Sequence, residues 1–426
     1  MKKVVLEQLR ETFYEERLPN GLLIRVIPRP DFAKTYSFFA TDFGSIDTKF
    51  TMDGKVYETP AGVAHYLEHK LFDMPDGNVM QQFSALGGSP NAFTGYSMTA
   101  YHVESTENWR ENLELLLRYV STPYFTEESV EKERGIIAQE IRMYEDSSGS
   151  RMYENLFAAL YQHHPIRVPI AGTVESIQDI TAQTLYDCHK AFYDPSNMML
   201  CVAGPVNPEL VVESARNILP KTPGGVGGRD YGPAEPLTAE KMARVEQNME
   251  VSMPGFTVAF RCDTPKTGAD ILRQELVGDL AAELLVGEST AFYTKLYEDG
   301  LIDCDFSAGY EGVKTLGMLS IGGDSNEPER VVDAVLKEAE RLGREGADEA
   351  LFQRLKRSAF GRRIRELDSF ENICYRMCQS TFEGAFYYDF PDLYRSITLD
   401  ETVRMIRDTV VPQRAALSLI YPNAKG

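Results

Sequence analysis

The sequence predicts an α+β protein made of two homologous domains, each an antiparallel-rich β-sheet packed with α-helices. Three observations lead to this prediction. Strand and helix patterns alternate in mixed order along the 426 residues, a Gly- and Pro-rich stretch separates two halves of similar length, and a strand–turn–helix pattern recurs in both halves. Mixed order with hairpin-like neighbouring strands favours antiparallel sheets that helices cover on one face.

The individual elements follow from residue type and spacing. Runs of β-branched and aromatic residues bounded by turn residues predict strands, and apolar residues at helical spacing predict helices. The predicted strands of the first half are 21–29, 34–44 and 98–106, and its predicted helices are 61–72, 78–88, 108–121, 130–146 and 150–162.

The division into domains rests on residues 219–240, LPKTPGGVGGRDYGPAEPLTAE, which have almost no aliphatic periodicity. Such a composition is typical of a linker. We therefore predict an N-terminal catalytic domain at 1–222, a linker at 223–240, and a homologous C-terminal domain at 241–426 that lacks the metal motif described below.

The inference of duplication rests on two segments, 198–219 and 317–342. Each predicts a strand that ends in Gly, a turn that contains Asn, and a helix that begins at Pro-Glu. Two copies of one ancestral unit would explain the similarity. Chance similarity stays open as the alternative, because strand–turn–helix patterns are common.

Composition excludes several classes of function. The formal net charge of −20 and the pI near 4.9 give an acidic surface that repels phosphate backbones, so we expect no nucleic-acid partner. No run of 18 apolar residues occurs, so we expect no membrane-spanning helix and no membrane partner. The N-terminus lacks an apolar signal region, and six cysteines in a chain of this length make no disulfide framework, which favours a reducing, cytoplasmic compartment. Cys374 and Cys378 share a predicted helix face, where packing is favoured over metal binding.

The strongest chemical signal is His65-Tyr66-Leu67-Glu68-His69, on the predicted helix 61–72. Residues four apart lie on the same helix face, so His65 and His69 can bind one Zn²⁺ ion. Glu68 then lies beside the metal, where it can act as general acid and base. The alternative is a pair of surface histidines. A catalytic zinc ion takes three protein ligands, so the third must come from elsewhere in the chain.

Further motifs follow this one. One is the segment Gly87-Gly88-Ser89-Pro90-Asn91-Ala92-Phe93-Thr94. The other is the predicted helix 130–146, on which Glu133 and Glu140 lie two turns apart. Together with the H-x-x-E-H order, typical of inverzincins, they make the chain resemble the insulinase/pitrilysin family of metallopeptidases, and more closely its half-length, processing-peptidase-like branch.

The resemblance implies roles for these residues. Glu140 is then the third zinc ligand and Glu133 supports the site from behind the ligands; for both, a solvated carboxylate is the alternative. The segment ending at Thr94 is then an edge strand to which an extended peptide adds, with Asn91, Ala92 and Thr94 binding the substrate.

One departure from the family bears on activity. Members that act alone carry an Arg and a Tyr in the second half that stabilise the transition state, and the matching positions here are Tyr297 and Asp303. The resemblance therefore implies a hetero-partner subunit that supplies the Arg/Tyr pair. A local donor, Arg362 or Arg363, is the competing account, and a homodimer stays open.

Together these observations predict a zinc-dependent endopeptidase of short or unfolded peptides, as the zinc-bearing subunit of a two-subunit enzyme. A non-catalytic scaffold subunit of the same family is the alternative. The substrate and the partner do not follow from the sequence.

Overall fold

The computed structural model describes residues 1–75, 77–221 and 224–423. These residues form two compact units that interleave along the chain. The first unit consists of Met1–Arg142, Pro169–Gly232 and Glu366–Phe382, and the second consists of Met143–Val168, Pro233–Arg365 and Glu383–Gly426. The predicted domain boundary at 222 and 223 lies outside the described residues.

A seven-stranded sheet forms the centre of the first unit, in the order β1-β2-β3-β11-β4-β10-β9. All neighbouring pairs are antiparallel except β3 and β11, which run parallel. The strands are β1 Lys2–Leu6, β2 Glu11–Arg17, β3 Leu23–Pro28, β4 Thr35–Thr41, β9 Gly88–Thr94, β10 Thr99–Ser105 and β11 Met198–Gly204. The predicted strands 21–29, 34–44 and 98–106 are thus confirmed as β3, β4 and β10.

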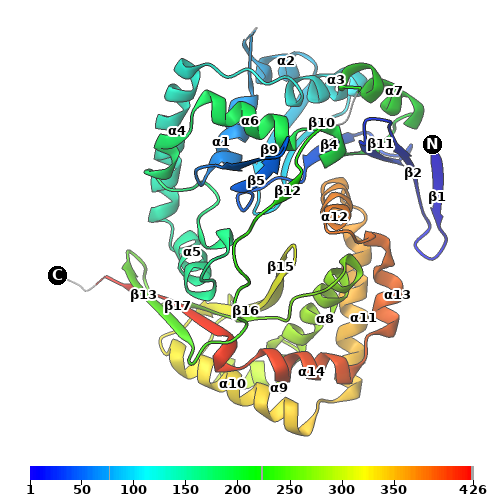
Figure 1. Ribbon diagram of the computed structural model, residues 1–426. Coiled ribbons are helices and arrows are strands. Elements are labelled where there is room, and N and C mark those ends of the chain that lie inside the picture. The colour runs from blue at the N-terminus through cyan, green and yellow to red at the C-terminus, as the bar shows by residue number, and fades with distance from the viewer. Residues whose placement is uncertain (76, 222–223, 424–426) are drawn as a thin grey trace. The chain divides into compact units, whose positions relative to one another are not determined.

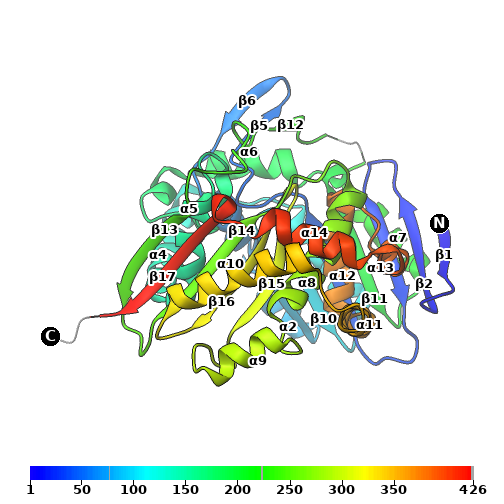
Figure 2. The ribbon, with the colours of Figure 1, turned by 90° about the horizontal axis from the view of Figure 1, so that it is seen from below.

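Helices cover both faces of this sheet, as Figure 1 shows. The helices are α1 Val63–Leu71, α2 Val79–Ala85, α3 Trp109–Val120, α4 Glu127–Asp146, α6 Ala182–Phe192, α7 Pro208–Ile218 and α12 Phe370–Phe382. Helix α12 lies against β11 and β4 on the face opposite α1 and α3. Two small sheets complete the unit, one of β5 Lys49–Met52, β6 Lys55–Glu58 and β12 Gly228–Arg229 and one of β7 Asp73–Met74 and β8 Gly77–Asn78. The sheet of β5, β6 and β12 appears in Figure 2.

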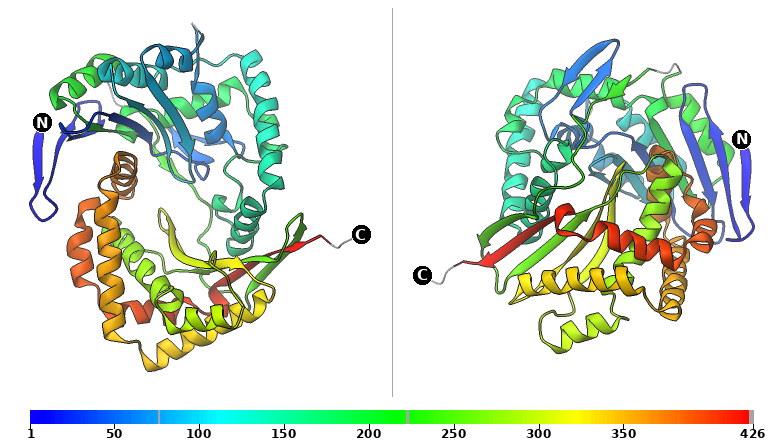
Figure 3. Two further views of the ribbon diagram at one scale, coloured as in Figure 1. Left: turned by 180° about the vertical axis from the view of Figure 1, so that it is seen from behind. Right: turned by 60° about the horizontal axis from the view of Figure 1, so that its bottom comes forward.

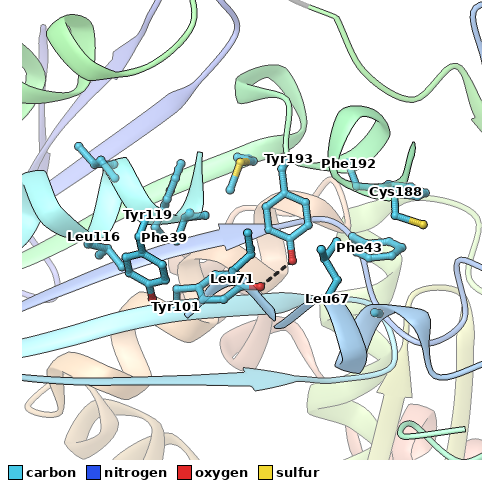
Figure 4. Packing of buried hydrophobic residues seen from close by; sticks show 14 of the residues in the cluster. Phe39, Phe43, Leu67, Leu71, Tyr101, Leu116, Tyr119, Cys188, Phe192 and Tyr193 are labelled. Atoms are coloured by element: carbon cyan, nitrogen blue, oxygen red, sulfur yellow. Dashed lines mark hydrogen bonds between the residues drawn. The ribbon is translucent and has the colours of Figure 1, made fainter. Parts of the chain in front are cut away.

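The main core of this unit lies between the sheet and helices α1, α3, α6 and α7. Figure 4 shows its aromatic centre, where the Tyr101 and Tyr193 hydroxyl groups hydrogen-bond at 2.7 Å beside Leu67 and Leu71 of α1. The apolar side of α1 is thereby fixed against the sheet, which orients the opposite side of the helix.

The second unit has a five-stranded sheet in the order β13-β17-β14-β16-β15. Its strands are β13 Ala243–Met249, β14 Gly255–Arg261, β15 Ser307–Val313, β16 Leu316–Asp324 and β17 Ala415–Pro422. Its helices are α5 Ser148–Leu160, α8 Gly268–Val286, α9 Ala291–Glu298, α10 Pro328–Glu345, α11 Glu349–Glu366, α13 Phe390–Ser396 and α14 Leu399–Thr409. Helices α8, α10 and α14 pack together along one face, as Figures 2 and 3 show, and α5 packs on β13, β14 and β17.

The two sheets share one topology, which confirms the predicted fold class of two homologous α+β domains. Strands β3, β11, β4, β10 and β9 occupy the same sheet positions, with the same directions, as β13, β17, β14, β16 and β15. The alignment of 198–219 with 317–342 is nevertheless wrong. Segment 198–219 forms β11 and α7, whose counterpart strand is β17, whereas 317–342 forms β16 and α10. The same local pattern simply arises at two different places in the fold.

Each half of the chain also contributes one helix to the other unit. Helix α5 follows α4 in the first half but belongs to the second unit, and α12 follows α11 in the second half but belongs to the first unit. Cys374 and Cys378 of α12 are fully buried, and burial, together with the neighbouring Cys201 thiol on β11, raises the pKa of the Cys374 thiol. No helix within the described ranges is long and apolar enough to cross a membrane.

Candidate metal centre

The H-x-x-E-H residues lie on α1, the helix predicted at 61–72. The helix begins after Gly62, whose φ of 91° is left-handed, and a Cβ at this position would lie 2.4 Å from the backbone oxygen of Ala171. Only glycine therefore fits this close approach without strain. His65 and Glu68 are both 8% exposed, and His69 is more open.

The third candidate ligand comes from α4, which packs beside α1. The Tyr66 hydroxyl group donates to the backbone oxygen of Val130, and Arg134 donates to the backbone oxygen of Ile180 at 3.0 Å. These bonds fix the first half of α4, and the buried Ile137 and Ile141 pack its second half on the core. Glu140, ten residues after Val130, then faces the two histidines.

The three predicted ligands lie together, with one donor atom of each within 4.8 Å of the others. His65 Nε2 is 3.7 Å from Glu140 Oε1, and His69 Nε2 is 3.4 Å from Glu140 Oε2. Two donors on a tetrahedral zinc ion with bonds of about 2.0–2.1 Å lie about 3.3 Å apart. The residues therefore fit a zinc ion in both donor chemistry and spacing.

Glu133 lies behind His69 rather than in the ligand set. Its Oε1 atom is 3.0 Å from His69 Nδ1. If Nδ1 donates its proton to this carboxylate, the lone pair of Nε2 points toward Glu140 and is free for a metal. This is the supporting position that the sequence predicts for Glu133.

Burial and charge shift the pKa values in opposite directions for the two histidines. Burial, assisted by the neighbouring His69, lowers the pKa of His65 to about 4, which keeps the ring neutral and able to bind a metal. Burial also opposes the charged form of His69. The hydrogen bond to Glu133 and the charges of Glu68 and Glu140 outweigh that effect and raise the pKa of His69.

Glu68 points to the same place as the ligands but is not one of the three. Burial raises the pKa of its carboxyl group, and the hydrogen bond from Thr94 and the charge of His69 oppose that rise. Thr94 Oγ1 donates to Glu68 Oε2 at 2.7 Å. The sequence did not predict this contact. The two residues are 26 positions apart, and neither the helix motif around Glu68 nor the strand motif around Thr94 indicates that they lie side by side.

The predicted edge strand is β9, the last strand of its sheet. Alternation along the strand puts Thr94 and Ala92 on the side of α1 and puts Phe93 against Phe38 on the other side. The Asn91 side chain accepts from the backbone N–H of Ala92 at 2.9 Å. Of the three residues predicted to bind substrate, Ala92 and Thr94 thus lie on the side of α1, where the Thr94 hydroxyl group is engaged with Glu68, whereas Asn91 lies on the side of Phe93.

The residues at the positions of the family's Arg/Tyr pair lie in the second unit. Tyr297 lies in the last turn of α9 with 55% of its surface exposed, and Asp303 follows in the next loop. The alternative donors are engaged. Arg363 is 4% exposed and pairs with Glu275 at 2.7 Å, and Arg362 pairs with Glu283.

Comparisons with known proteins agree with this fold. A family model described as Insulinase (Peptidase family M16) matches residues 52–174, and one described as Peptidase M16 inactive domain matches residues 179–359. The Bacillus subtilis protein named uncharacterized zinc protease YmfH is 38% identical over 429 residues, and the match covers 100% of both chains. The chain belongs to the M16 (insulinase) family.

Solved structures agree with this assignment. The structure of an M16-like peptidase from Alicyclobacillus acidocaldarius superposes with a TM-score of 0.93 at 32% identity and covers 99% of this chain and 100% of that one. Pitrilysin shares the fold with a TM-score of 0.78 at 20% identity, but the match covers 99% of this chain and only 46% of pitrilysin. The prediction that this chain is a half-length member of the family is thereby confirmed.

Proposed function

We propose that the protein is a zinc-dependent endopeptidase that hydrolyses short or unfolded peptides. The observation that carries this proposal is the convergence of His65, His69 and Glu140 within 4.8 Å, with the buried Glu68 beside them. A scaffold subunit would have no use for all four residues. The zinc protease names of the relatives support the same reading.

The roles of the residues follow from their positions. His65, His69 and Glu140 would hold the ion, and Glu133 would orient His69. When bound, zinc supplies Lewis acidity, which polarises a peptide carbonyl group and makes water more acidic. Glu68 Oε1, which accepts no hydrogen bond from the described residues, would take the proton of the attacking water and return it to the leaving amine.

The substrate class follows from β9. An edge strand presents backbone N–H and C=O groups to which an extended peptide can add as a further strand. These main-chain bonds require a peptide segment without its own secondary structure, and they place little demand on its sequence. We therefore assign short or unfolded peptides as substrates.

The activity is tested with a mixture of quenched-fluorescent peptides. The wild-type protein is expected to cleave them, and Glu68→Gln is expected to bind one equivalent of zinc without cleaving. Glu128→Gln, an exposed carboxylate at the start of α4, serves as the matched control and should retain activity. A protein that binds zinc but cleaves no peptide, alone or with a partner, would favour the scaffold role.

A hetero-partner that supplies the Arg/Tyr pair belongs to the same proposal. Tyr297 and Asp303 stand at the positions of that pair, and the Arg362 and Arg363 guanidinium groups are held in ion pairs. Loss of one oxyanion donor costs about 2.7–4 kcal/mol of transition-state stabilisation. We expect cleavage to rise at least a hundredfold when a partner with the Arg/Tyr pair is added, and full activity of the chain alone would exclude the requirement.

A further inference from the structure

Thr94 and Glu68 make the one hydrogen bond between β9 and the carboxylate proposed as general base, among the described residues. We propose that Thr94 is a positioning residue that fixes the Glu68 carboxylate for proton transfer, rather than a residue that binds substrate through its side chain. This inference rests on the proposed peptidase function, but the contact itself can be tested without it.

The position of Thr94 is set by rigid neighbours. It ends β9 and pairs with Thr99 at the start of β10, where Thr99 is fully buried and its hydroxyl group donates to the backbone oxygen of Phe43 at 2.9 Å. On the other side of the contact, Glu68 is 8% exposed and its helix is packed against the sheet. Neither partner can move far without disturbing a packed element.

The Thr94 hydroxyl group gives the buried Glu68 carboxylate a hydrogen-bond donor. A Glu side chain has three rotatable bonds, and an apolar wall offers no partner to its carboxylate. The bond of 2.7 Å from Thr94 Oγ1 holds Oε2 and leaves Oε1 as the oxygen that can accept a proton. A general base must lie within about 2.6–3.2 Å of the proton it takes, so a fixed carboxylate spends more time in the productive position.

The contact also joins two functions on one strand. Ala92, two residues before Thr94, lies on the edge strand to which a peptide would add, and Thr94 holds the base. A peptide bound along β9 is thereby in register with the oxygen that acts on it. A Thr94 that donated to a peptide carbonyl group would instead need its hydroxyl proton for the peptide, and that proton is donated to Glu68.

Two substitutions at Thr94 separate these roles. Thr94→Val keeps the shape and removes the hydroxyl group, whereas Thr94→Ser keeps the hydroxyl group. A hydrogen bond to a charged group predicts a fall in kcat of at least about tenfold for Thr94→Val. We expect KM to change less than about twofold, zinc to stay at one equivalent, and Thr94→Ser to recover most of kcat.

Thr99→Val is the matched control, because it removes a hydroxyl group from the paired position without touching Glu68. It should lower the midpoint of thermal unfolding and leave kcat within about twofold. The inference is overturned if Thr94→Val retains wild-type kcat, if it raises KM at unchanged kcat, or if Thr94→Ser is as impaired as Thr94→Val.

A double-mutant cycle tests the contact independently of activity. The midpoints of thermal unfolding are measured for wild type, Thr94→Val, Glu68→Met and the double variant of the purified protein. We expect non-additive shifts for this cycle and additive shifts when Thr99→Val replaces Thr94→Val. Non-additivity in a protein that cleaves no peptide, alone or with a partner, would refute the peptidase and keep the contact. Additivity would overturn the inference even in an active enzyme.

Discussion

Glu133 Oε1 lies 3.0 Å from Nδ1 of His69, and on the far side of the same ring Nε2 lies 3.4 Å from Glu140 Oε2. One imidazole thus stands between two carboxylates of one helix, seven residues apart. His65 has no such support, since its buried Nδ1 has no hydrogen-bond partner in the described part of the chain. His69 is therefore held by hydrogen bonding and His65 by packing.

This difference predicts the effect of Glu133→Gln. The substitution removes the charge that orients His69, and loss of such a supporting residue typically weakens metal binding by about 10–100-fold. Zinc affinity is measured by competition with a chromophoric chelator. Glu131→Gln, on the same helix but 70% exposed and paired with Arg134, is the control and should bind zinc as wild type does. Equal affinities for both variants would contradict the role of Glu133.

Zinc should stabilise the folded protein through its three ligands. A ligand at 100 times its dissociation constant adds about 2.7 kcal/mol to the free energy of unfolding. We expect zinc to raise the midpoint of thermal unfolding of the metal-free protein, and Glu140→Gln to lose most of that rise. The control variant Glu128→Gln should show the same zinc-induced rise as the wild-type protein. A shift that survives Glu140→Gln would mean that the ion binds elsewhere.

Stability should fall in acid because of His189. Burial lowers the pKa of this residue to about 4, although its ring bonds to the backbone oxygen of Val120 at 2.9 Å. Because the folded pKa lies below the unfolded value of about 6.5, the contribution is complete above pH 6.5 and is lost as the pH falls toward 4. The loss amounts to about 3 kcal/mol at most. Urea unfolding at several pH values should show a shallower slope for His189→Gln, and an unchanged slope would exclude His189 as the cause.

The predicted linker should contribute to stability through Glu235. Its carboxylate accepts from the backbone N–H groups of Gln162 at 2.9 Å, His163, and His164 at 2.6 Å. Burial opposes its charge, but these bonds and Arg261 hold the pKa of Glu235 below its usual value. Glu235→Gln should lower the free energy of unfolding by about 1.5–3 kcal/mol, measured in urea. Glu240→Gln, in an exposed part of the same segment, should change it by less than about 0.5 kcal/mol.

Much of the site could be predicted because its signals are local. The spacing of His65 and His69 fixes their common face on any helix, and the offset of seven positions from Glu133 to Glu140 does the same on α4. The contact of Thr94 with Glu68 could not be predicted, because it depends on which strand of the sheet packs beside α1. No spacing along the chain contains that information.

For the fold, too, local elements could be predicted from the sequence and long-range packing could not. Mixed strand and helix patterns predicted the class and most elements of the first half. The exchange of α5 and α12 depends on long-range packing, such as the 2.8 Å bond from Arg25 of β3 to Thr381 and the ring contact of Phe93 with Tyr375. For the same reason, segment 317–342 was matched to the wrong strand of the other sheet.

The exchange of α12 sets the order in which the chain can mature on the ribosome. Every proposed metal ligand has been synthesised once Glu140 is made, yet α12 follows only at residues 370–382. Until then the sheet face that carries Tyr36 and Phe38 lacks the helix that packs on it, and both side chains are buried in the finished protein. A fragment that ends in the linker would therefore hold all three proposed ligands and still expose apolar surface that promotes aggregation, because the helix that packs on this sheet face is made late.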